Sequence, residues 1–362
     1  MVWELTQACS LACRHCRADA RPERHPDELT TAEGQALLEA ARQFGDRQLV
    51  VLSGGDPMAR DDVVGLVRYG DDLGLRMTLT PSGTERFTPD RLRALTDAGL
   101  RRVALSLDGA TAASHDDFRG EAGSFDRTLA AARAAREVGL PLQLNTTVCA
   151  DTVDELPAIR ELAVELGVVL WSVFFLVPVG RGRLLEPISP ARAERVMTWL
   201  AEVADVAPFG LKTTEAPHYR RVRLQRRTRA TVDGGGSTDD RRTDAVTPRV
   251  VAGDGFVFVS HRGEIYPSGF LPMAVGNVRE ASLVERYRSA DLFRRLRDPE
   301  ALRGKCGACP FNRVCGGSRS RAYATTGDPL ESDPLCPYVP PGYVGPLPAS
   351  LDPAAAADVR AR

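Results

Sequence analysis

The chain has 362 residues, of which 43% are hydrophobic and 26% are charged, a composition ordinary for a globular protein. This length allows one large domain and a smaller one. A formal net charge of −1 gives no indication of nucleic-acid binding. No apolar run approaches the ~20 residues of a membrane helix. No basic and then apolar leader precedes Cys9, so we expect a cytoplasmic location.

Strand and helix patterns alternate through the first half of the chain. A first strand is expected from Val2, and helical periodicity separates each later strand from the one before. The expected strands after the first lie at 48–52, 76–80, 102–107, 142–148 and 169–177, and the intervening helices at 31–44, 61–73, 89–98, 125–138 and 153–166. This alternation predicts a parallel α/β sheet with helices outside. Six units are too few to close an eight-stranded barrel, and the active site is expected at the C-terminal ends of the strands.

The second half is more varied. A helix is expected at 189–206, a flexible Gly-, Ser- and Asp-rich insertion at 231–247, a hairpin around Arg262-Gly263, and a helix at 283–296. Four parts are therefore predicted: a core at 1–207, a connecting segment with the insertion at 208–249, a small α+β domain at 250–339, and a mostly disordered tail at 340–362.

Three cysteines stand close together as Cys9-x3-Cys13-x2-Cys16. Four thiolates complete a tetrahedral zinc site or a four-iron cluster, whereas three leave one metal position open. An iron left open in this way can bind a small molecule. The alternatives are a zinc knuckle, for which His15 is the nearby candidate fourth ligand, or three unrelated buried thiols.

A second group of four cysteines lies near the C-terminus. Its members are Cys306, Cys309, Cys315 and Cys336. Four ligands can saturate one cluster, which fits a structural or electron-carrying role, and zinc is the alternative on spacing alone. The remaining cysteine, Cys149, is expected to be a small buried hydrophobe.

The spacing of the first three cysteines resembles the motif of radical S-adenosylmethionine (SAM) enzymes. The resemblance implies a partial (βα)6 barrel, open on one side. It also implies a [4Fe-4S] cluster held by Cys9, Cys13 and Cys16, whose free iron chelates SAM. Reduction by a partner such as flavodoxin or ferredoxin then yields a 5′-deoxyadenosyl radical. The four later cysteines resemble the twitch or SPASM auxiliary-cluster extension, which implies a second [4Fe-4S] cluster. Ser268 stands where fuller versions often have a further cysteine, which favours one auxiliary cluster.

The same resemblance implies SAM-binding residues at the ends of the strands. The family usually has Gly-Gly-Glu-Pro where this chain has Gly54-Gly55-Asp56-Pro57, and the alternative is a plain turn. Arg119 resembles an arginine that pairs with the SAM carboxylate. The other implied contacts are Ser106 and Asp108 near the methionine and ribose, Asn145 at the ribose hydroxyls and His15 on the adenine, with Ser82, Val177 and Gly180 as weaker pocket candidates. For Ser106 and Asp108 the alternative is a helix N-cap and turn.

Segments at 215–221, 260–272, 315–324 and 327–338 resemble the radical SAM enzymes of alternative heme and heme d biosynthesis. That resemblance implies a tetrapyrrole substrate whose carboxylate side chain is modified. Arginines suit carboxylates, and His or Tyr could reach iron. The candidates are Arg220, Arg221, His218 and Tyr219, with the hairpin at 261–270; the alternative is a solvated basic helix face.

Two other functions remain open at this point. A radical SAM maturase would modify a short ribosomally made peptide instead of a tetrapyrrole. A non-catalytic iron–sulfur electron carrier would need no SAM pocket, and the three-cysteine loop beside Gly54-Gly55-Asp56-Pro57 argues against it.

Overall fold

The structure, a computed structural model, describes residues 1–232 and 250–351. Within these ranges, nine strands form one sheet in the order β7-β6-β5-β4-β3-β2-β1-β8-β9. They are β1 (Val2–Thr6), β2 (Leu49–Gly54), β3 (Arg76–Leu79), β4 (Arg102–Ser106), β5 (Leu142–Val148), β6 (Leu170–Phe175), β7 (Gly210–Thr214), β8 (Phe258–Val259) and β9 (Ile265–Tyr266). Neighbours from β7 to β8 are parallel, and β9 is antiparallel to β8. The two edge strands do not pair with each other, so the sheet is a partial barrel.

The six strands predicted from the sequence are β1 to β6. They form because their apolar runs are buried, with Val50 and Leu52 of β2 both 0% exposed. The seventh parallel strand, β7, was not predicted. It is a half-exposed edge strand whose sequence, Gly-Leu-Lys-Thr-Thr, contains no apolar run. The predicted core boundary at residue 207 therefore falls within one continuous sheet.

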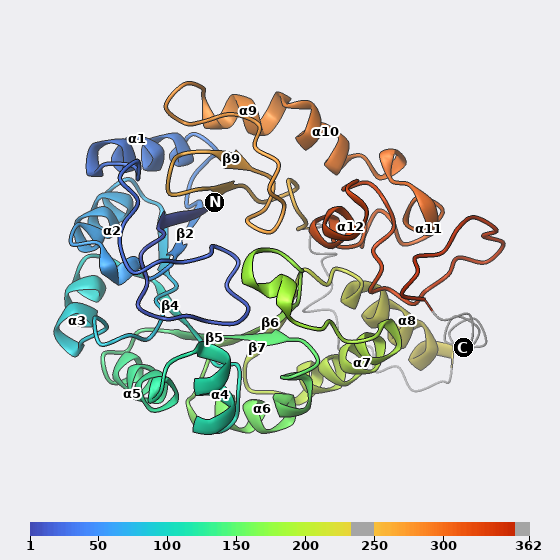
Figure 1. The fold of residues 1–362 in the computed structure, drawn as a ribbon, viewed down its shortest axis with the longest axis horizontal. Helices are drawn as coiled ribbons and strands as arrows, with labels where there is room; N and C mark the ends of the chain where they lie inside the picture. Colours follow the sequence, from blue (N-terminus) through green and yellow to red (C-terminus); the bar gives the residue numbers. More distant parts are fainter. Residues whose placement is uncertain (233–249, 352–362) are drawn as a thin grey trace.

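Helices cover the outer face of the curved sheet, as Figure 1 shows for α1, α2, α3 and α5. The helices are α1 (Thr31–Arg42), α2 (Val63–Asp72), α3 (Pro89–Asp97), α4 (Ala112–Arg119), α5 (Ser124–Glu137), α6 (Leu156–Glu165), α7 (Pro190–Val206), α8 (Tyr219–Val232), α9 (Leu283–Ser289), α10 (Asp291–Arg297), α11 (Gly304–Gly307) and α12 (Arg319–Thr326). The main core lies between this layer and the sheet, where Trp3 and Leu5 of β1 are 0% exposed.

Helix α4 was not predicted, although it carries residues of the candidate site. Its eight residues are mostly polar and too few to show an apolar period. Its start is fixed by Thr111, whose hydroxyl accepts from the Ser114 backbone N–H, and its end by Gly120 at φ 67°. The result is a short helix that places Phe118 and Arg119 beside the cysteine loop.

The C-terminal part differs from the sequence prediction in two places. The helix expected at 283–296 is two helices, because Ala290 is extended at φ −59° and ψ 134°. The tail expected to be disordered from Pro340 is described as far as Leu351; it has no helix or strand and Val344 is 98% exposed, but Leu351 is buried at 5% exposure. Ser350 Oγ also donates to the Pro334 carbonyl at 2.7 Å. Residues 352–362 lie outside the described residues, as does nearly all of the predicted insertion at 231–247.

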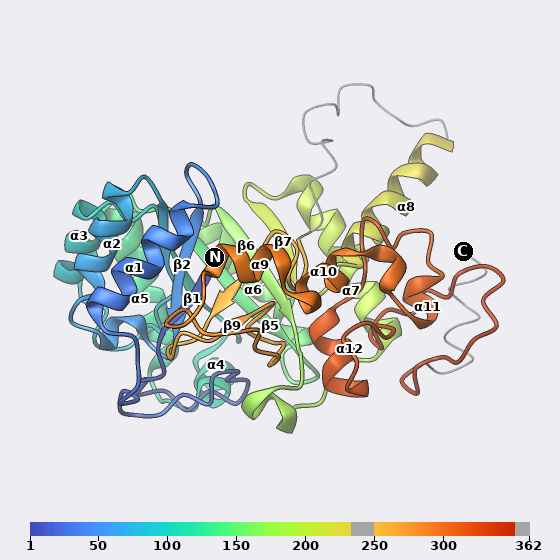
Figure 2. The same ribbon diagram turned by 90° about the horizontal axis from the view of Figure 1, so that it is seen from above.

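The C-terminal ends of the parallel strands share one edge of the barrel. The long loop between β1 and α1, helix α4 and the segment after β6 lie together at this edge in Figure 2. Polar groups at the ends of different strands are therefore brought into one region. In the described part of the chain, none of the helices has the length and hydrophobicity needed to span a bilayer.

Candidate active site

The loop after β1 gathers the first three cysteines. Cys9 and Cys13 are 7% and 8% exposed and pack in one small apolar cluster, against which Cys16 also lies. Backbone N–H groups point at the sulfurs: Leu11 donates to Cys9 Sγ at 3.4 Å and Ala20 to Cys16 Sγ at 3.5 Å. Burial raises the pKa of Cys9 and Cys13, and the Leu11 N–H opposes this rise at Cys9. Such N–H contacts stabilise thiolate ligands of a metal.

The end of β2 supports this loop from one side. Gly55 N–H donates to the Thr6 carbonyl at 2.8 Å, and Asp56 N–H to that of Ala8 at 2.7 Å. A Cβ on Gly55 would lie 2.4 Å from the Ala8 oxygen. The glycines thus allow the backbone to approach the cysteine loop itself, whereas the sequence indicated approach to a ligand.

Asp56, the residue that departs from the family pattern, is 1% exposed. Its carboxylate accepts from the backbone N–H groups of Met58 at 3.1 Å and Ser82 at 3.3 Å, and from Thr84 Oγ1 at 2.5 Å. Pro57 then begins the short 3-10 helix η1 (Pro57–Ala59). The Asp56 side chain therefore fastens this turn to the segment after β3.

The segment after β6 supports the loop from the other side. Gly180 has φ 53°, and a Cβ there would lie 2.5 Å from the Cys16 carbonyl oxygen. The next residue, Arg181, donates from Nε to the Cys13 carbonyl at 2.8 Å and from Nη1 to that of Ala20 at 3.2 Å. Sequence reasoning missed Arg181; its only local signal was its place after Gly180 at the end of a strand.

Arg119 and Asp108 form a buried pair beside the three thiols. Arg119 Nη1 donates to Asp108 Oδ2 at 3.5 Å, and Thr147 N–H donates to Asp108 Oδ1 at 2.7 Å. Burial opposes the charge of Arg119, but the neighbouring Cys13 and Asp108 raise its pKa above the ordinary value. The guanidinium therefore remains a cation in the field of the cysteines.

His15 lies in the same region, 4.0 Å from Asp108 Oδ2 through Nε2. Burial lowers the pKa of His15 to about 4, so its ring is neutral at neutral pH. One face stacks on Phe118 with ring centroids 4.7 Å apart. Among the described residues, neither His15 Nδ1 nor Arg119 Nε has a hydrogen-bond partner, although both are buried.

The remaining predicted residues are on or near the barrel wall. Ser106 of β4 and Asn145 of β5 are opposite each other in register, and Asn145 Oδ1 accepts from Gln143 Nε2 at 2.7 Å. Ser82, a weak sequence candidate, connects the turn after β2 with the cysteine loop. Its Oγ donates to the Gly55 carbonyl at 2.7 Å and accepts from Cys9 Sγ at 3.5 Å. Cys149 is buried at 0% exposure, as expected.

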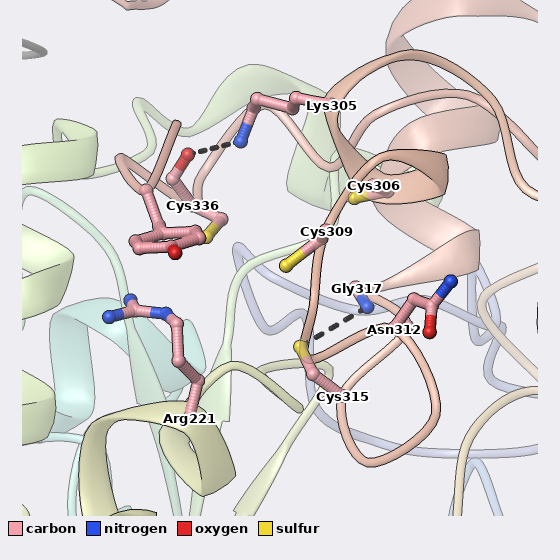
Figure 3. A pocket seen from close by; sticks show the side chains of 10 residues that line it. Arg221, Lys305, Cys306, Cys309, Asn312, Cys315, Gly317 and Cys336 are labelled. Carbon is pink, nitrogen blue, oxygen red and sulfur yellow. Dashed lines mark hydrogen bonds between the residues drawn. The ribbon is translucent and has the colours of Figure 1, made fainter. Parts of the chain in front are cut away.

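The four later cysteines line one small cavity. Figure 3 shows them around one space with Arg221 and Lys305 at its edge. Gly317 N–H donates to Cys315 Sγ at 3.4 Å and Asp333 N–H to Cys306 Sγ at 3.4 Å. Burial raises the pKa of Cys336 above its ordinary value, and the cations Lys305 and Arg221 partly oppose this rise. Two cations thus offset the charge that thiolates would bring.

Ser268 does not belong to this cavity. It is absent from the lining, which includes Cys336, and its hydroxyl donates to Glu215 Oε1 at 3.2 Å. Within the described ranges, no three His, Cys, Asp or Glu side chains are grouped so that they could hold one metal ion. The thiolates of a four-iron cluster bind different irons and need not converge in that way.

Most of the residues expected to bind substrate at 218–221 are buried. His218 is 0% exposed, and Arg221 is 1% exposed and bound to both carboxylate oxygens of Glu194. Tyr219 is buried in the core, where its hydroxyl donates to the Leu200 carbonyl at 3.4 Å. Arg220 donates to the Val314 carbonyl at 3.4 Å. Among the described residues, neither ring nitrogen of His218 has a hydrogen-bond partner, and contact of this segment with the substrate stays a prediction.

Comparison with known proteins decides the family. Residues 3–163 match the model of the radical SAM superfamily. Over 340 residues, the chain is 43% identical to the AdoMet-dependent heme synthase of Methanosarcina barkeri, covering 94% of this chain and 96% of that protein. The chain belongs to the radical SAM superfamily.

The chain is also similar to a second curated protein and to a solved structure. The PqqA peptide cyclase of Gluconobacter oxydans is 34% identical over 93% of this chain and 90% of its own length. The structure of Streptococcus suis SuiB bound to the precursor peptide SuiA superposes with a TM-score of 0.69 at 17% identity, covering 92% of this chain and 75% of that one. At this identity the likeness to SuiB shows the fold alone.

The three-cysteine site fits the cofactors of radical SAM enzymes, SAM and a [4Fe-4S] cluster. The chain provides three thiols with N–H donors aimed at two of the sulfurs. Beside them, the buried Arg119 Nε and His15 Nδ1 lack partners among the described residues. A bound ligand with both acceptor and donor groups would satisfy these two atoms. The match to the radical SAM superfamily and to AdoMet-dependent heme synthases shows that the chain is an enzyme.

Proposed function

We propose that this enzyme oxidises a carboxylate side chain of an iron tetrapyrrole. The observation that carries this proposal is the 43% identity to an AdoMet-dependent heme synthase, which extends over 94% of this chain. Loss of one hydrogen atom, one electron and carbon dioxide from a propionate side chain would leave a vinyl group. This is a balanced reaction that needs a hydrogen acceptor and an electron acceptor.

The first site would supply the hydrogen acceptor. With SAM bound to a cluster on Cys9, Cys13 and Cys16, the family's chemistry provides a 5′-deoxyadenosyl radical. The chain's own residues would orient SAM. Arg119 would form a charge-assisted bond to its carboxylate. His15, one face of which stacks on Phe118, would bind the adenine with its other face. Gly55 and Asp56 would act indirectly by shaping the loop, and Asn145 and Ser106 would face the ribose from the wall.

The second site would supply the electron acceptor. We infer a [4Fe-4S] cluster on Cys306, Cys309, Cys315 and Cys336, since all four thiols line one cavity that also contains Arg221 and Lys305. These cations would stabilise the added negative charge of a reduced cluster. An external reductant such as flavodoxin or ferredoxin and a cytoplasmic location complete the proposal, because clustered thiols of this kind need a reducing compartment.

The proposal is tested by anaerobic turnover. The reconstituted enzyme, supplied with SAM, dithionite and iron-coproporphyrin III, should release 5′-deoxyadenosine and convert the porphyrin to a product lighter by one carbon dioxide and two hydrogens for each side chain. The Cys9→Ala/Cys13→Ala/Cys16→Ala variant serves as the blank. Release of 5′-deoxyadenosine with the porphyrin unchanged in mass would exclude this substrate.

Maturation of a peptide is the second candidate. It is favoured by the 34% identity to a PqqA peptide cyclase over 93% of this chain. Turnover of a short precursor peptide, seen as a mass change dependent on SAM, would replace the tetrapyrrole proposal if the porphyrin is untouched in the same assay.

A further inference from the structure

A buried chain of three charged or polar side chains links β1, the cysteine loop and the hairpin. Glu4 of β1 is 4% exposed. One of its carboxylate oxygens, Oε2, accepts from Arg17 Nη2 at 2.5 Å, and the other, Oε1, lies 2.5 Å from His261 Nδ1. Arg17 follows Cys16 directly, and His261 follows β8. The three residues thus connect the first cysteine site to the hairpin, which was a sequence candidate for contacting substrate.

These side chains are on the inner side of the barrel. Side chains alternate along a strand, and Trp3, next to Glu4, points outward, because its ring would lie 2.5 Å from a Cβ on Gly34 of α1. Glu4 therefore points to the concave side, and His261 meets it there. His261 lies beyond the C-terminal end of β8, on the same edge as the cysteine loop.

The hydrogen bond to Glu4 determines which ring nitrogen of His261 is available. Both carboxylate oxygens of Glu4 are engaged, one by the cation Arg17 and the other by His261. Glu4 is therefore a carboxylate at neutral pH and can only accept, so the proton lies on Nδ1. In the neutral ring, Nε2 carries a lone pair. No described residue donates to it, and 11% of the His261 side chain remains exposed.

We propose that His261 binds the iron of the tetrapyrrole substrate through Nε2, with Glu4 and Arg17 as positioning residues. Metal-binding histidines characteristically donate their other ring N–H to a carboxylate, which orients the ring and strengthens the ligand. Imidazole is also an ordinary axial ligand of haem iron. The inference rests on the proposed function, because it requires an iron-bearing substrate.

The other four histidines of the chain do not have this combination. His115 and His218 are 0% exposed. His15 stacks on Phe118 inside the cysteine site. His25, whose ring centroid is 5.6 Å from that of His261, accepts the Asp27 N–H at its Nδ1 and has no carboxylate as close as Glu4 is to His261. Because His25 is adjacent and partly exposed, it is the matched control.

The test separates binding of the iron from binding of the macrocycle. Iron-coproporphyrin III is titrated into the reconstituted protein and followed by Soret difference spectra and by the electron paramagnetic resonance of the ferric complex. Metal-free coproporphyrin III is titrated in parallel and followed by fluorescence. His261→Ala should bind the metal-free porphyrin like the wild type but lose the imidazole-type spectrum, and added imidazole should restore it. His25→Ala should keep the wild-type spectrum.

Glu4→Gln supplies a second measurement. Loss of a carboxylate behind a metal-binding histidine weakens metal affinity by typically 10–100-fold. This variant should therefore bind iron-coproporphyrin at least about 10-fold more weakly and metal-free coproporphyrin as before, whereas a merely structural role would weaken both alike. A wild-type spectrum in His261→Ala would overturn this inference and leave the proposed function standing. Failure of the wild type to bind either porphyrin would overturn the proposed function, and this inference with it.

Discussion

Arg119 is the residue on which recognition of SAM is expected to depend most. It is 6% exposed, faces Asp108, and leaves its Nε without a partner among the described residues. A hydrogen bond to a charged group contributes about 1.5–3 kcal/mol, and about 1.4 kcal/mol is tenfold in affinity. Arg119→Ala should therefore weaken SAM binding at least about tenfold, measured by calorimetry on the reconstituted protein.

The matched control is Arg127→Ala, since Arg127 is an arginine of α5 that pairs with Glu121 at 3.1 Å near the surface. It should bind SAM like the wild type. Unchanged SAM affinity in Arg119→Ala, at equal iron content, would remove Arg119 from the site. A loss of iron in that variant would instead indicate that its main role is to balance the charge of the cysteines.

His218 should make the protein sensitive to acid. Burial lowers the pKa of His218 to about 3; Arg221, Arg321 and Lys305 add to this, and Asp333 opposes it. The unfolded chain takes up a proton near pH 6.5, which the folded protein accepts only near pH 3. The stability due to the neutral ring is thus complete above pH 6.5 and is lost as the pH falls from 6.5 toward 3, by up to ~1.4 kcal/mol per pH unit.

The variant His218→Leu should reduce this sensitivity. Between pH 7 and pH 5 its stability should fall by about 2 kcal/mol less than that of the wild type. The measurement is the thermal midpoint of both proteins at the two pH values under anaerobic conditions. Parallel shifts in wild type and variant would show that His218 does not contribute to the acid sensitivity.

At the level of elements, most of the barrel could be predicted from the sequence. Buried parallel strands are apolar runs, and each is followed by an amphipathic helix, so β1 to β6 are visible locally. Strand β7 and helix α4 were missed because contacts with neighbouring elements stabilise them. Ser172 of β6 pairs with Lys212 of β7, and α4 packs on α5. Neither shows a pattern of its own.

The candidate site likewise has a part that could be predicted from local sequence and a part that could not. The two cysteine groups are local spacings and could be read directly. Arg181 on the cysteine loop and the contact of Glu4 with His261 join residues far apart in the sequence, so no spacing reveals them. For Arg221, by contrast, the local composition is misleading. An arginine-rich segment is typical of a solvated face, yet Arg221 is buried by Glu194, 27 positions earlier.

Helix α12 fastens the C-terminal cysteine region to the barrel through Arg321. This buried side chain donates from Nη2 to the carbonyls of Phe175 at the end of β6 and Glu215 after β7, at 3.1 and 2.8 Å, and from Nη1 to Asp333 Oδ1 at 3.2 Å. Arg321→Met would leave Asp333 as a buried charge without its main partner, which costs roughly 3–5 kcal/mol. The thermal midpoint should fall, and limited proteolysis should cleave the region after residue 250 first.

Two comparisons make this test specific. Arg294→Met on α10 removes an arginine that is 65% exposed and should change little. Adding Asp333→Asn to Arg321→Met removes the unpaired charge and should recover part of the lost stability. If the double variant is no more stable than Arg321→Met, the ion pair is not the reason for the loss.

At the scale of the whole molecule, polar contacts connect the barrel with the cysteine-rich region. Glu215, directly after β7, accepts from Ser268 Oγ at 3.2 Å, Ser318 Oγ at 2.5 Å and Ser320 Oγ at 3.0 Å. The hairpin and the start of α12 are thereby fixed against the end of the sheet. These contacts join the cysteine-rich region to the barrel that carries the first cysteine group, as the proposed reaction with two acceptors for one substrate would need.

The two groups should nevertheless be separable by their metal content. Anaerobic reconstitution is expected to give about eight irons per chain in two four-iron clusters. Changing Cys9, Cys13 and Cys16 to Ala should remove half of the iron and all release of 5′-deoxyadenosine from SAM. Changing Cys306 and Cys309 to Ala should also remove half of the iron, but SAM cleavage should persist while conversion of substrate is lost, because the substrate electron would have no acceptor. Metal analysis and the product assay on the same preparations decide this.

A fully active protein with zinc in the second site would exclude an electron-accepting role for that site. SAM cleavage by the triple variant would exclude the three-cysteine site as the source of the radical.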